Sequence, residues 1–272
     1  MNRSHLLAAR SAAVAGVAAT AALLLAGCGP STSSASGGSG NSGSSGSSGH
    51  STSASTSGSS SGSSGGNSTS GITTAAYFPI GTGYTWVYKE SGFGGKGTST
   101  QKVLSIKSSA AGQVATLAST LTYPTRKTFN ETLIFRPDGS IEVPLTQFGA
   151  SVKIESGSIV WPSTAQLASG QPYHNTIVMK VDEAGQHETL KMPVTVRGEG
   201  TSSITVPAGT YQAALINETM DASIDGYKIS MAVRTWVANG VGPVKSEVYS
   251  DMLGGSSSSP ISTEELLSFT KG

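Results

Sequence analysis

The feature that most constrains the fold is the alternation of apolar and polar residues over short stretches between residues 84 and 249. Tyr84, Trp86 and Tyr88 fall at every second position, so one face of this first segment carries three large rings. Residues 114–123 and 127–135 continue the alternation. This part of the chain is rich in Thr, Val, Ile and Tyr, and we find no convincing run of apolar residues at helical spacing. The pattern predicts an all-β protein.

Short turn signals separate these segments. Asp138-Gly139 lies between the segment 127–135 and Ile141, and an Asp-Gly pair between apolar strands is a strong hairpin signal. Pro207 and Gly209 predict a turn that leads into a further strand. The other expected elements are strands over 175–181 and 190–196 around a turn at 182–185, and strands over 211–218, 227–237 and 244–249 joined by turns at Asp225-Gly226 and Asn239-Gly240.

Two stretches are less regular. Residues 147–171 form a looser connection between two meanders. In residues 262–270, Ser262 and Glu265 match a helix-capping box, whereas Leu267 and Phe269 alternate as in a strand. We favour a closing strand over a short helix for this last segment.

The order of the segments predicts a strongly curved antiparallel sheet or a partly closed β-barrel, because closing a sheet removes exposed edges. A weak internal sequence repeat suggests a further hypothesis about the organisation of the sheet. The pattern apolar-x-x-Gly-x-x-aromatic opens the first meander at residues 80–86 and the second at residues 167–173. It indicates two related meander halves, with chance as the alternative because three positions match.

The N-terminus has the layout of a secretory signal. Arg3 and Arg10 precede an apolar run over residues 11–25, and the only cysteine of the 272 residues follows in Leu25-Ala26-Gly27-Cys28. This stretch resembles the signal of bacterial lipoproteins, in which the chain is cut before the cysteine and the thiol receives a diacylglycerol. The resemblance implies a signal peptide over residues 1–27 and lipidation at Cys28.

Two other interpretations of this N-terminus are an uncleaved transmembrane anchor and ordinary secretion. The apolar run of about 15 residues is shorter than the ~20 residues that span a bilayer. No cluster of Lys or Arg follows it as a stop-transfer signal. The lipoprotein interpretation is therefore favoured, and acyl chains on Cys28 would hold the protein at the extracytoplasmic face of a bacterial membrane.

Composition divides the rest of the chain into a tether and a domain. Residues 29–71 are mostly Ser and Gly and contain no Val, Leu, Ile, Met or aromatic residue, so they cannot bury enough apolar surface to fold. With Cys28 they form an expected disordered tether over residues 28–71, with an average end-to-end distance of roughly 35–40 Å. Residues 72–272 remain as one β-domain of sufficient size for a core.

Charge and cysteine content exclude several classes of function. Removal of Arg3 and Arg10 with the signal leaves 15 basic and 16 acidic side chains, so no basic surface indicates nucleic-acid binding. The domain has no cysteine, which excludes disulfides and thiolate metal sites.

Three motifs of the domain suggest a family. They are Tyr77-Phe78-Pro79-Ile80-Gly81-x-Gly83-x-x-Trp86, residues 206–211 (VPAGTY) and residues 236–245 (WVANGVGPVK). In this order they resemble an uncharacterised group of bacterial lipoprotein β-domains. The resemblance covers most of residues 76–250 and implies a fold akin to the half-barrels of lipoprotein carriers, which enclose acyl chains between a curved sheet and a lid. This chain lacks obvious lid helices.

Polar motifs of the domain give no strong catalytic or cofactor signal. Residues 92–97 match G-x-G-x-x-G, but the following residues predict a strand instead of the helix that a dinucleotide site requires. Asp221-x-Ser223-x-Asp225-Gly226 is similar to the start of a calcium loop, but its twelfth position is Ala232 instead of Glu. We predict turns or strands at both places, and no cofactor.

Histidines and tryptophans are the remaining candidates for function. His174 and His187 are expected on strand surfaces and could meet across a hairpin near Ala184, yet two ligands make a weak zinc site. No nucleophile of a Ser-His-Asp hydrolase is indicated, so we assign no catalytic or metal-binding residue. We expect Trp86 and Trp236 in the core, with a glycan-stacking surface as the alternative, and Trp161 as the exception most suited to exposure.

These observations favour a lipid-anchored, extracytoplasmic, non-enzymatic binding module for an apolar or extended ligand, either a lipid or a peptide. Its membrane contact would be made by the acyl chains on Cys28. The alternative is a structural or protein-interaction module of the cell envelope. A hydrolase is the third hypothesis, and it would require His174, His187 and carboxylates to cluster.

Overall fold

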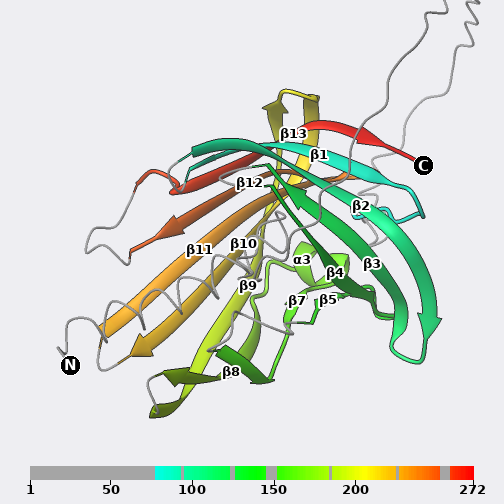
Figure 1. Ribbon diagram of the computed structural model, residues 1–272. Coiled ribbons are helices and arrows are strands. Elements are labelled where there is room, and N and C mark those ends of the chain that lie inside the picture. Colours follow the sequence, from blue (N-terminus) through cyan, green and yellow to red (C-terminus); the bar gives the residue numbers. More distant parts are fainter. Residues whose placement is uncertain are drawn as a thin grey trace, which may run out of the picture. The chain divides into compact units, whose positions relative to one another are not determined.

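The fold is seen in a computed structural model that describes residues 77–92, 95–122, 126–144, 152–183, 186–224, 227–251 and 258–272 (Figure 1). Within these ranges the chain is almost entirely β-structure, with one short helix. The elements are β1 (Thr85–Gly92), β2 (Gly95–Ser109), β3 (Gly112–Leu121), β4 (Lys127–Phe135), β5 (Ile141–Val143), β6 (Val152–Ser156), β7 (Ile159–Trp161), α3 (Thr164–Ala168), β8 (Tyr173–Glu183), β9 (Gln186–Val206), β10 (Gly209–Ile224), β11 (Tyr227–Ala238), β12 (Gly242–Ser250) and β13 (Ser262–Thr270).

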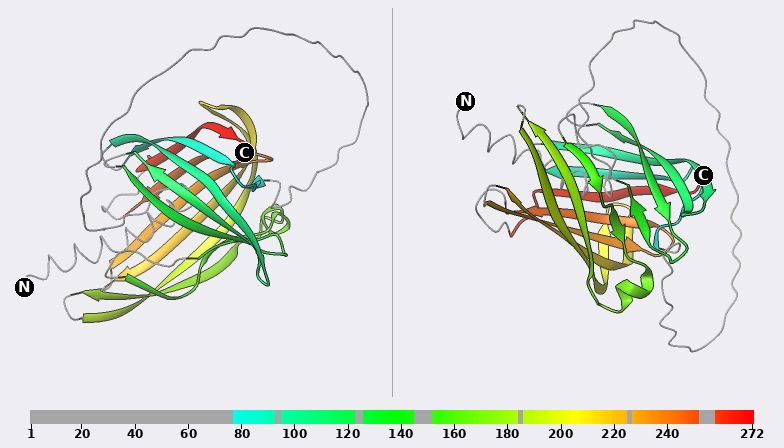
Figure 2. Two further views of the ribbon diagram at one scale, coloured as in Figure 1. Left: turned by 45° about the vertical axis from the view of Figure 1, so that its right-hand side comes forward. Right: turned by 90° about the horizontal axis from the view of Figure 1, so that it is seen from below.

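The described strands form one antiparallel sheet in the order β6-β8-β9-β10-β11-β12-β13-β1-β2-β3-β4-β5-β7. The last strand, β13, lies between β12 and β1 and so joins the two meanders into a continuous sheet. The sheet is strongly curved and its edges are not hydrogen-bonded to each other (Figures 1 and 2). The predicted curved antiparallel sheet is confirmed, and the sheet stops short of a closed barrel.

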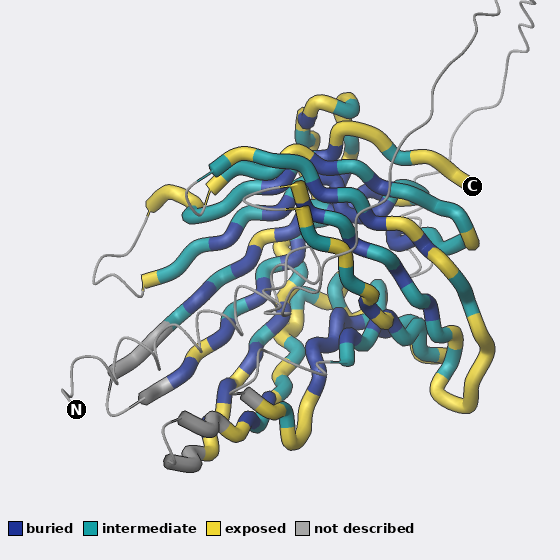
Figure 3. Tube along the Cα trace, viewed as in Figure 1, coloured by how far each residue is buried: buried dark blue, intermediate teal, exposed yellow. Residues whose placement is uncertain are grey.

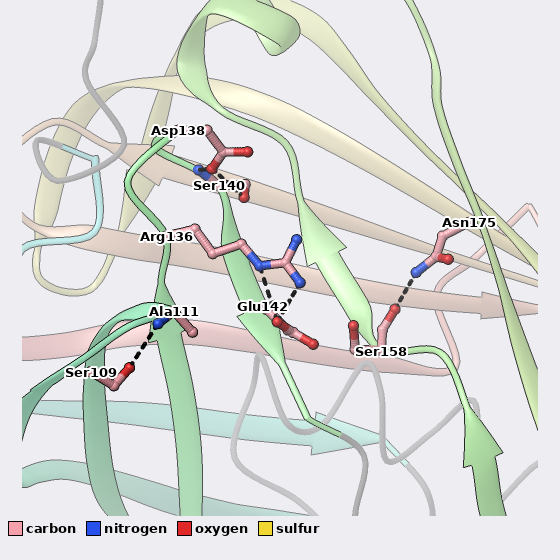
Figure 4. Close-up of polar contacts among 8 residues, drawn as sticks. All are labelled: Ser109, Ala111, Arg136, Asp138, Ser140, Glu142, Ser158 and Asn175. Carbon is pink, nitrogen blue, oxygen red and sulfur yellow. Dashed lines mark hydrogen bonds and ion pairs between the residues drawn. The ribbon is translucent and has the colours of Figure 1, made fainter.

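The two edge strands, β6 and β7, are consecutive in the chain although they lie at opposite ends of the strand order. Only Gly157 and Ser158 separate them, so the chain itself crosses between the two edges. Asn175 of β8 donates a hydrogen bond from Nδ2 to the carbonyl oxygen of Ser158 at 2.5 Å (Figure 4). We call this crossing at residues 157–158 the seam.

Glycine is required at the seam by both backbone conformation and space. Gly157 has a φ of +89°, in the region that side chains disfavour. A Cβ atom at this position would lie 2.4 Å from the carbonyl oxygen of Thr176 on β8. The close approach of two backbones is what lets the chain pass from one edge of the sheet to the other.

Alternating burial defines an inner and an outer face of the sheet. Along β3, residues Ala115, Leu117, Ser119 and Leu121 are buried while the residues between them are partly exposed. Buried and more exposed positions alternate along most strands (Figure 3). The buried residues of all these strands join in one hydrophobic core on the inner face, which explains the period-two pattern of the sequence.

Most of the expected strands and turns are confirmed. The structure has the predicted strand at 127–135 and the predicted closing strand at 262–270 with those bounds. Turns also occur at Asp138, at Pro207 and at Asn239. The Asp138 turn is held by a hydrogen bond from the Ser140 amide to Asp138 Oδ1, beside an ion pair of Arg136 with Glu142 (Figure 4). Of the turn expected at 182–185, Asp182 and Glu183 belong to β8, and residues 184–185 lie outside the described residues, as does the turn expected at Asp225-Gly226.

The loose stretch at 147–171 contains three elements that the sequence did not predict. These are β6, β7 and α3, and α3 corrects the expectation that no helix is present. Ser163 caps α3, because its Oγ accepts from the Gln166 amide while the Gln166 side chain accepts from the Ser163 amide. The five-residue helix buries no side chain, so it lacks the apolar periodicity by which helices are found in sequences.

An aromatic cluster fills one end of the inner face. Phe78 lies within 6.3 Å, between ring centroids, of Trp86, Phe135 and Trp161. Phe269 stacks on Trp86 at 5.1 Å. Trp161 is only 1% exposed, which contradicts its expected exposure, because β7 pairs with β5 and turns the indole into the core. Trp86 is buried as predicted.

Residues of the three sequence motifs have structural roles at this end. Trp86 Nε1 donates to the carbonyl oxygen of Val241 at 2.6 Å, which ties the first motif to the third. Gly242, with a φ of +102°, leaves room for this indole, because a Cβ there would lie 3.2 Å from Nε1. The second motif packs on β13 through a hydrogen bond from the Ala208 amide to the Leu266 carbonyl.

Candidate functional site

Polar side chains are buried among apolar ones on the inner face, and they make this face the candidate site. The buried polar residues of the described structure are Ser99, Gln101, Ser119, Glu131, Ser140, Ser158, Glu218, Thr235, Ser246 and Glu264. Burial of a polar group is costly unless the group is hydrogen-bonded or neutralised. The charges and contacts of these residues therefore indicate what the inner face can accommodate.

Three glutamates from three strands, Glu90, Glu131 and Glu264, gather on the side of the inner face formed by β13 and β1–β4. We call them the acidic group. Glu264 of β13 is the cross-strand partner of Glu90 of β1. Ser99 of β2 donates a hydrogen bond from Oγ to Glu264 Oε1 at 2.6 Å. Burial and the negative charge of Glu90 raise the pKa of Glu264 well above its ordinary value.

Glu131 of β4 is also held in a protonated state near neutral pH. Its side chain is 5% exposed, and burial raises its pKa from 4.5 to about 8, while the nearby Ser119 hydroxyl acts in the opposite direction. Ser119 Oγ and Glu131 Oε1 nevertheless lack a hydrogen bond of good geometry. The charge of Glu131 adds to the pKa rise of Glu264, so the acids of the group influence one another.

A further buried carboxyl, Glu218 of β10, lies near the indole of Trp161. Burial raises the pKa of Glu218 to about 7, and Trp161 acts in the opposite direction. Both carboxyl oxygens of Glu218 and Nε1 of Trp161 lack hydrogen bonds of good geometry within the described structure. Trp161 approaches this carboxyl from β7, the edge strand that follows the seam.

Gln101 of β2 contributes another unpaired group to the acidic side of the inner face. Its Nε2 is fully buried and has no hydrogen-bond partner among the described residues. Gln101 is the cross-strand partner of Ser119 and lies two residues from Ser99, on the same face of β2. Buried donors without a partner are uncommon in folded proteins. The acidic side of the inner face thus combines carboxyls with an amide donor that has no acceptor.

The other side of the inner face is apolar and rich in methionine. Met179 of β8, Met192 of β9, Met220 of β10 and Met231 of β11 are all at most 2% exposed. Met220 and Met231 are direct cross-strand partners. We call these four residues the methionine face. Methionine is flexible and polarisable, so it adapts to apolar groups of different shapes.

The candidate residues from the sequence do not assemble into a site. His174 lies exposed on β8 with Nδ1 3.1 Å from Thr195 Oγ1, and its cross-strand partner is Thr195. His187 is paired with Asp182 and lies eight residues from Thr195 along β9, which is about 26 Å. The expectation that the two histidines meet across the hairpin is wrong, because the register places them at opposite ends of it.

The two motifs that are similar to a dinucleotide loop and a calcium loop lie at strand positions where the structure describes them. In the G-x-G-x-x-G stretch, Gly92 ends β1 and Gly95 begins β2, so a strand follows as predicted. Asp221 lies within β10 opposite Ser230, and Asp225 lies outside the described residues. In the described part of the chain, no group of three His, Cys, Asp or Glu side chains is arranged to hold a metal ion.

Trp236, expected in the core, is only partly buried. The ammonium group of Lys245 lies 5.3 Å from the centre of its ring. Trp236 lies between Thr235 and Val237, which are both buried on the inner face, so alternation along β11 places its side chain on the outer face.

The sequence analysis did not identify the buried glutamates, although a signal for them was present. Glu131 alternates in phase with Phe129, Leu133 and Phe135, so it falls on the apolar face of its strand. Cys28, the predicted lipidation site, lies outside the described residues, as do the predicted signal peptide and the predicted tether. Among the residues that the structure describes there is also no helix of the length and hydropathy needed to cross a bilayer.

Comparison with known proteins supports a shared fold. A family model described as DUF3108-like matches residues 83–258. A predicted lipoprotein of Parabacteroides distasonis ATCC 8503 has a similar structure, with a TM-score of 0.54 and 18% identity, over 72% of this chain and 98% of that chain. No curated protein matches the sequence.

A second solved structure has the same architecture. A predicted exported protein with a YmcC-like fold from Bacteroides fragilis NCTC 9343 is similar with a TM-score of 0.51 and 14% identity, over 72% of this chain and 99% of that chain. At these identities the similarity shows the fold alone.

Proposed function

The chain belongs to the DUF3108-like family, and on that premise we propose that it is a lipid-anchored, extracytoplasmic protein whose inner face binds an apolar or extended ligand without catalysis. The ligand class is a lipid or a peptide. The anchor is Cys28, and residues 28–71 tether the β-domain to the membrane. The names of the two similar structures, a predicted lipoprotein and a predicted exported protein, support this location.

One observation carries the binding proposal. The inner face combines an adaptable methionine face with buried polar atoms that have no partner in the described structure, including Gln101 Nε2 and Glu131 Oε1. A sheet that serves only as a scaffold gains nothing from such groups, because each unpaired buried atom costs about 1–3 kcal/mol. A ligand that satisfies them while covering apolar surface would offset this cost.

Native mass spectrometry tests the proposal with the full chain purified from its membrane in mild detergent. We expect a bound species of defined mass in one-to-one stoichiometry. Met220→Trp fills the methionine face and should abolish this species, whereas Leu215→Trp, on the outer face of the same strand, should retain it. Circular dichroism checks that both variants are folded. A wild-type protein without bound ligand in several mild detergents would contradict the proposal and favour a structural module of the envelope.

A further inference from the structure

The outer face of β13, β1 and β2 is rich in lysine. These three strands lie side by side in the sheet (Figure 1) and contain four lysines, which are Lys89, Lys96, Lys102 and Lys107. All four are exposed. The register pairs each of them with a position that alternates with the buried positions of the neighbouring strand, so all four lie on the outer face.

The acids of the same three strands face mostly the other way. Glu264 and its cross-strand partner Glu90 lie on the inner face, so Glu265 is the one outward-facing acid of these described strands. Lys89 of β1 and Lys245 of β12 are the cross-strand partners of Glu265, so a lysine flanks it on each side. The near balance of charges over the whole chain hides this separation of lysines from acids.

Two leucines are exposed on these strands as well. Leu104 of β2 is 44% exposed and Leu267 of β13 is 37% exposed, and they are the exposed large hydrophobic residues of the described structure. Each is the extra residue of a β-bulge, because it has no partner where the register of β2 with β3, or of β13 with β1, shifts. A bulge re-aims a side chain, and these two bulges hold leucines out of the core.

The leucines and the nearest lysines are close enough to meet one surface together. Lys102 is two residues from Leu104 on β2, and Leu267 is two residues from the partner of Lys89 on β13. By the spacing of residues along strands and of strands in a sheet, all four lie within about 20 Å of one another. We call Lys89, Lys102, Leu104 and Leu267 the outer patch.

This combination fits a surface that carries anionic groups above an apolar interior. Lysine ammonium groups are attracted to any polyanion, but an anionic polymer in water has no apolar place for a leucine side chain. A membrane with anionic lipids offers headgroups to the lysines and hydrocarbon to the leucines. The proposed anchor at Cys28 would keep the β-domain near such a surface.

We propose that the outer patch docks the β-domain on a membrane that contains anionic lipids. Lys89 and Lys102 lie at the headgroups, and Leu104 and Leu267 enter the upper part of the acyl region. The inference goes beyond the proposed function, because it concerns the face of the sheet opposite the ligand site and holds whether or not that site binds.

Environment-sensitive fluorescence of the full, acylated chain on vesicles tests the proposal. The β-domain has no cysteine, so Leu104→Cys or Leu267→Cys provides one site for an NBD fluorophore. On vesicles rich in phosphatidylglycerol we expect NBD fluorescence to rise and a lipid with a nitroxide on its acyl chain to quench it. Pure phosphatidylcholine vesicles should give neither change, and high salt should reverse both, because it screens the lysines.

Thr176→Cys is the control for the label, because Thr176 is exposed on β8, at the other end of the strand order. An NBD group there should not respond to either kind of vesicle. Circular dichroism checks that the labelled variants are folded. Equal responses of the patch labels to the two kinds of vesicle would overturn the proposal.

Lysine variants test the contribution of charge. The double variant Lys89→Gln, Lys102→Gln should lower the equilibrium constant for docking roughly 25-fold, since each lysine near an anionic surface contributes about fivefold. Lys191→Gln is the matched control, because Lys191 is exposed on the outer face of β9, and it should dock as the wild type does.

Unchanged docking of the double variant would contradict the role of the lysines and overturn the proposal. Lysine-dependent binding to dextran sulfate, without any response of the patch labels to phosphatidylglycerol vesicles, would overturn it in favour of an anionic polymer.

Discussion

At the scale of single residues, Glu131, Glu218 and Glu264 are unusual because they are carboxyls buried on an otherwise apolar face, and burial raises the pKa of each. Glu131 keeps its proton to about pH 8, and Glu264 keeps one well above its ordinary range. A protonated carboxyl is tolerated in a sheet interior because it carries no charge and can both donate and accept hydrogen bonds. The inner face is therefore less charged at neutral pH than its sequence suggests.

This state of Glu131 predicts how stability depends on pH. The folded protein holds a proton that the unfolded chain releases above about pH 4.5, so the contribution is fully favourable below pH 4.5 and is lost as pH rises to about 8. The loss is about 1.4 kcal/mol per pH unit within this window. Glu131→Gln should therefore be roughly 2–4 kcal/mol more stable than the wild type at pH 8.5 and similar at pH 4.5.

Urea unfolding at the two pH values measures this difference, with Glu265→Gln on the outer face as the control. If the difference in unfolding free energy between Glu131→Gln and the wild type is the same at both pH values, the buried state of Glu131 is contradicted.

Trp86 gives a second prediction for a single residue. Its indole donates to the Val241 carbonyl at 2.6 Å and stacks on Phe269, so Trp86→Phe leaves a partly buried carbonyl without its donor. We expect a loss of about 1–3 kcal/mol in unfolding free energy. Trp236→Phe is the control, because the Trp236 ring lies partly exposed under Lys245, and it should cost less than 1 kcal/mol. Similar losses in the two variants would refute the role assigned to Trp86.

At the scale of elements, the long strands could be predicted from the sequence and the sheet edges could not. Residues 127–135 alternate over nine positions, and Leu267 and Phe269 alternate within 262–270, which favoured a strand at both places. The edge strand β7 has three residues, Ile159, Val160 and Trp161, all buried, so no alternation marks it. Its place beside β5 follows from long-range pairing that local patterns do not contain.

The candidate site could not be identified from the sequence for a related reason. Alternation shows that Glu131 lies on the apolar face of its strand, and the same applies to Glu218 beside Ile216 and Met220. That Glu264 faces Glu90 depends on the pairing of β13 with β1, which are 170 or more residues apart at Gly92 and Ser262. Sequence patterns therefore identify inward carboxyls one by one, but not their assembly.

The seam gives a prediction for the elements that it joins. Gly157→Ala adds a Cβ that lies 2.4 Å from the Thr176 carbonyl oxygen, in addition to the cost of its positive φ. Gly200→Ala is a matched control, because Gly200 has a φ of +85° with no atom within 4 Å of an added Cβ. Both variants lose the roughly 1–2 kcal/mol of a positive φ. Gly157→Ala should lose clearly more, measured by urea unfolding, and equal losses would argue against tight packing at the seam.

At the scale of the whole molecule, the proposed function has two parts, a location at the membrane and a ligand-binding inner face. The proposed membrane location rests on Leu25-Ala26-Gly27-Cys28, and the proposed tether over residues 28–71 would give the β-domain reach from the membrane. The binding face rests on the curvature of a single sheet, which gathers side chains from strands distant in sequence onto one inner face. The two parts of the proposal are independent and are tested separately.

Processing at Cys28 tests the proposed membrane location. Mass spectrometry of the mature N-terminus should find a chain that begins at Cys28 and carries the mass of a diacylglycerol. Treatment of the cells with globomycin should instead accumulate a precursor that retains residues 1–27. An unmodified mature chain secreted into the medium would contradict lipid anchoring.

The central claim is that the inner face binds a ligand, and methionine methyl NMR tests it most directly. Four of the six methionines, Met179, Met192, Met220 and Met231, form the methionine face, so their ¹³C-labelled methyl groups report on it. Titration of the full chain in mild detergent with 1-decanol should shift these four signals to saturation, with a single binding constant. Four signals that remain unchanged at saturating 1-decanol, beyond the effect of detergent alone, would contradict the claim.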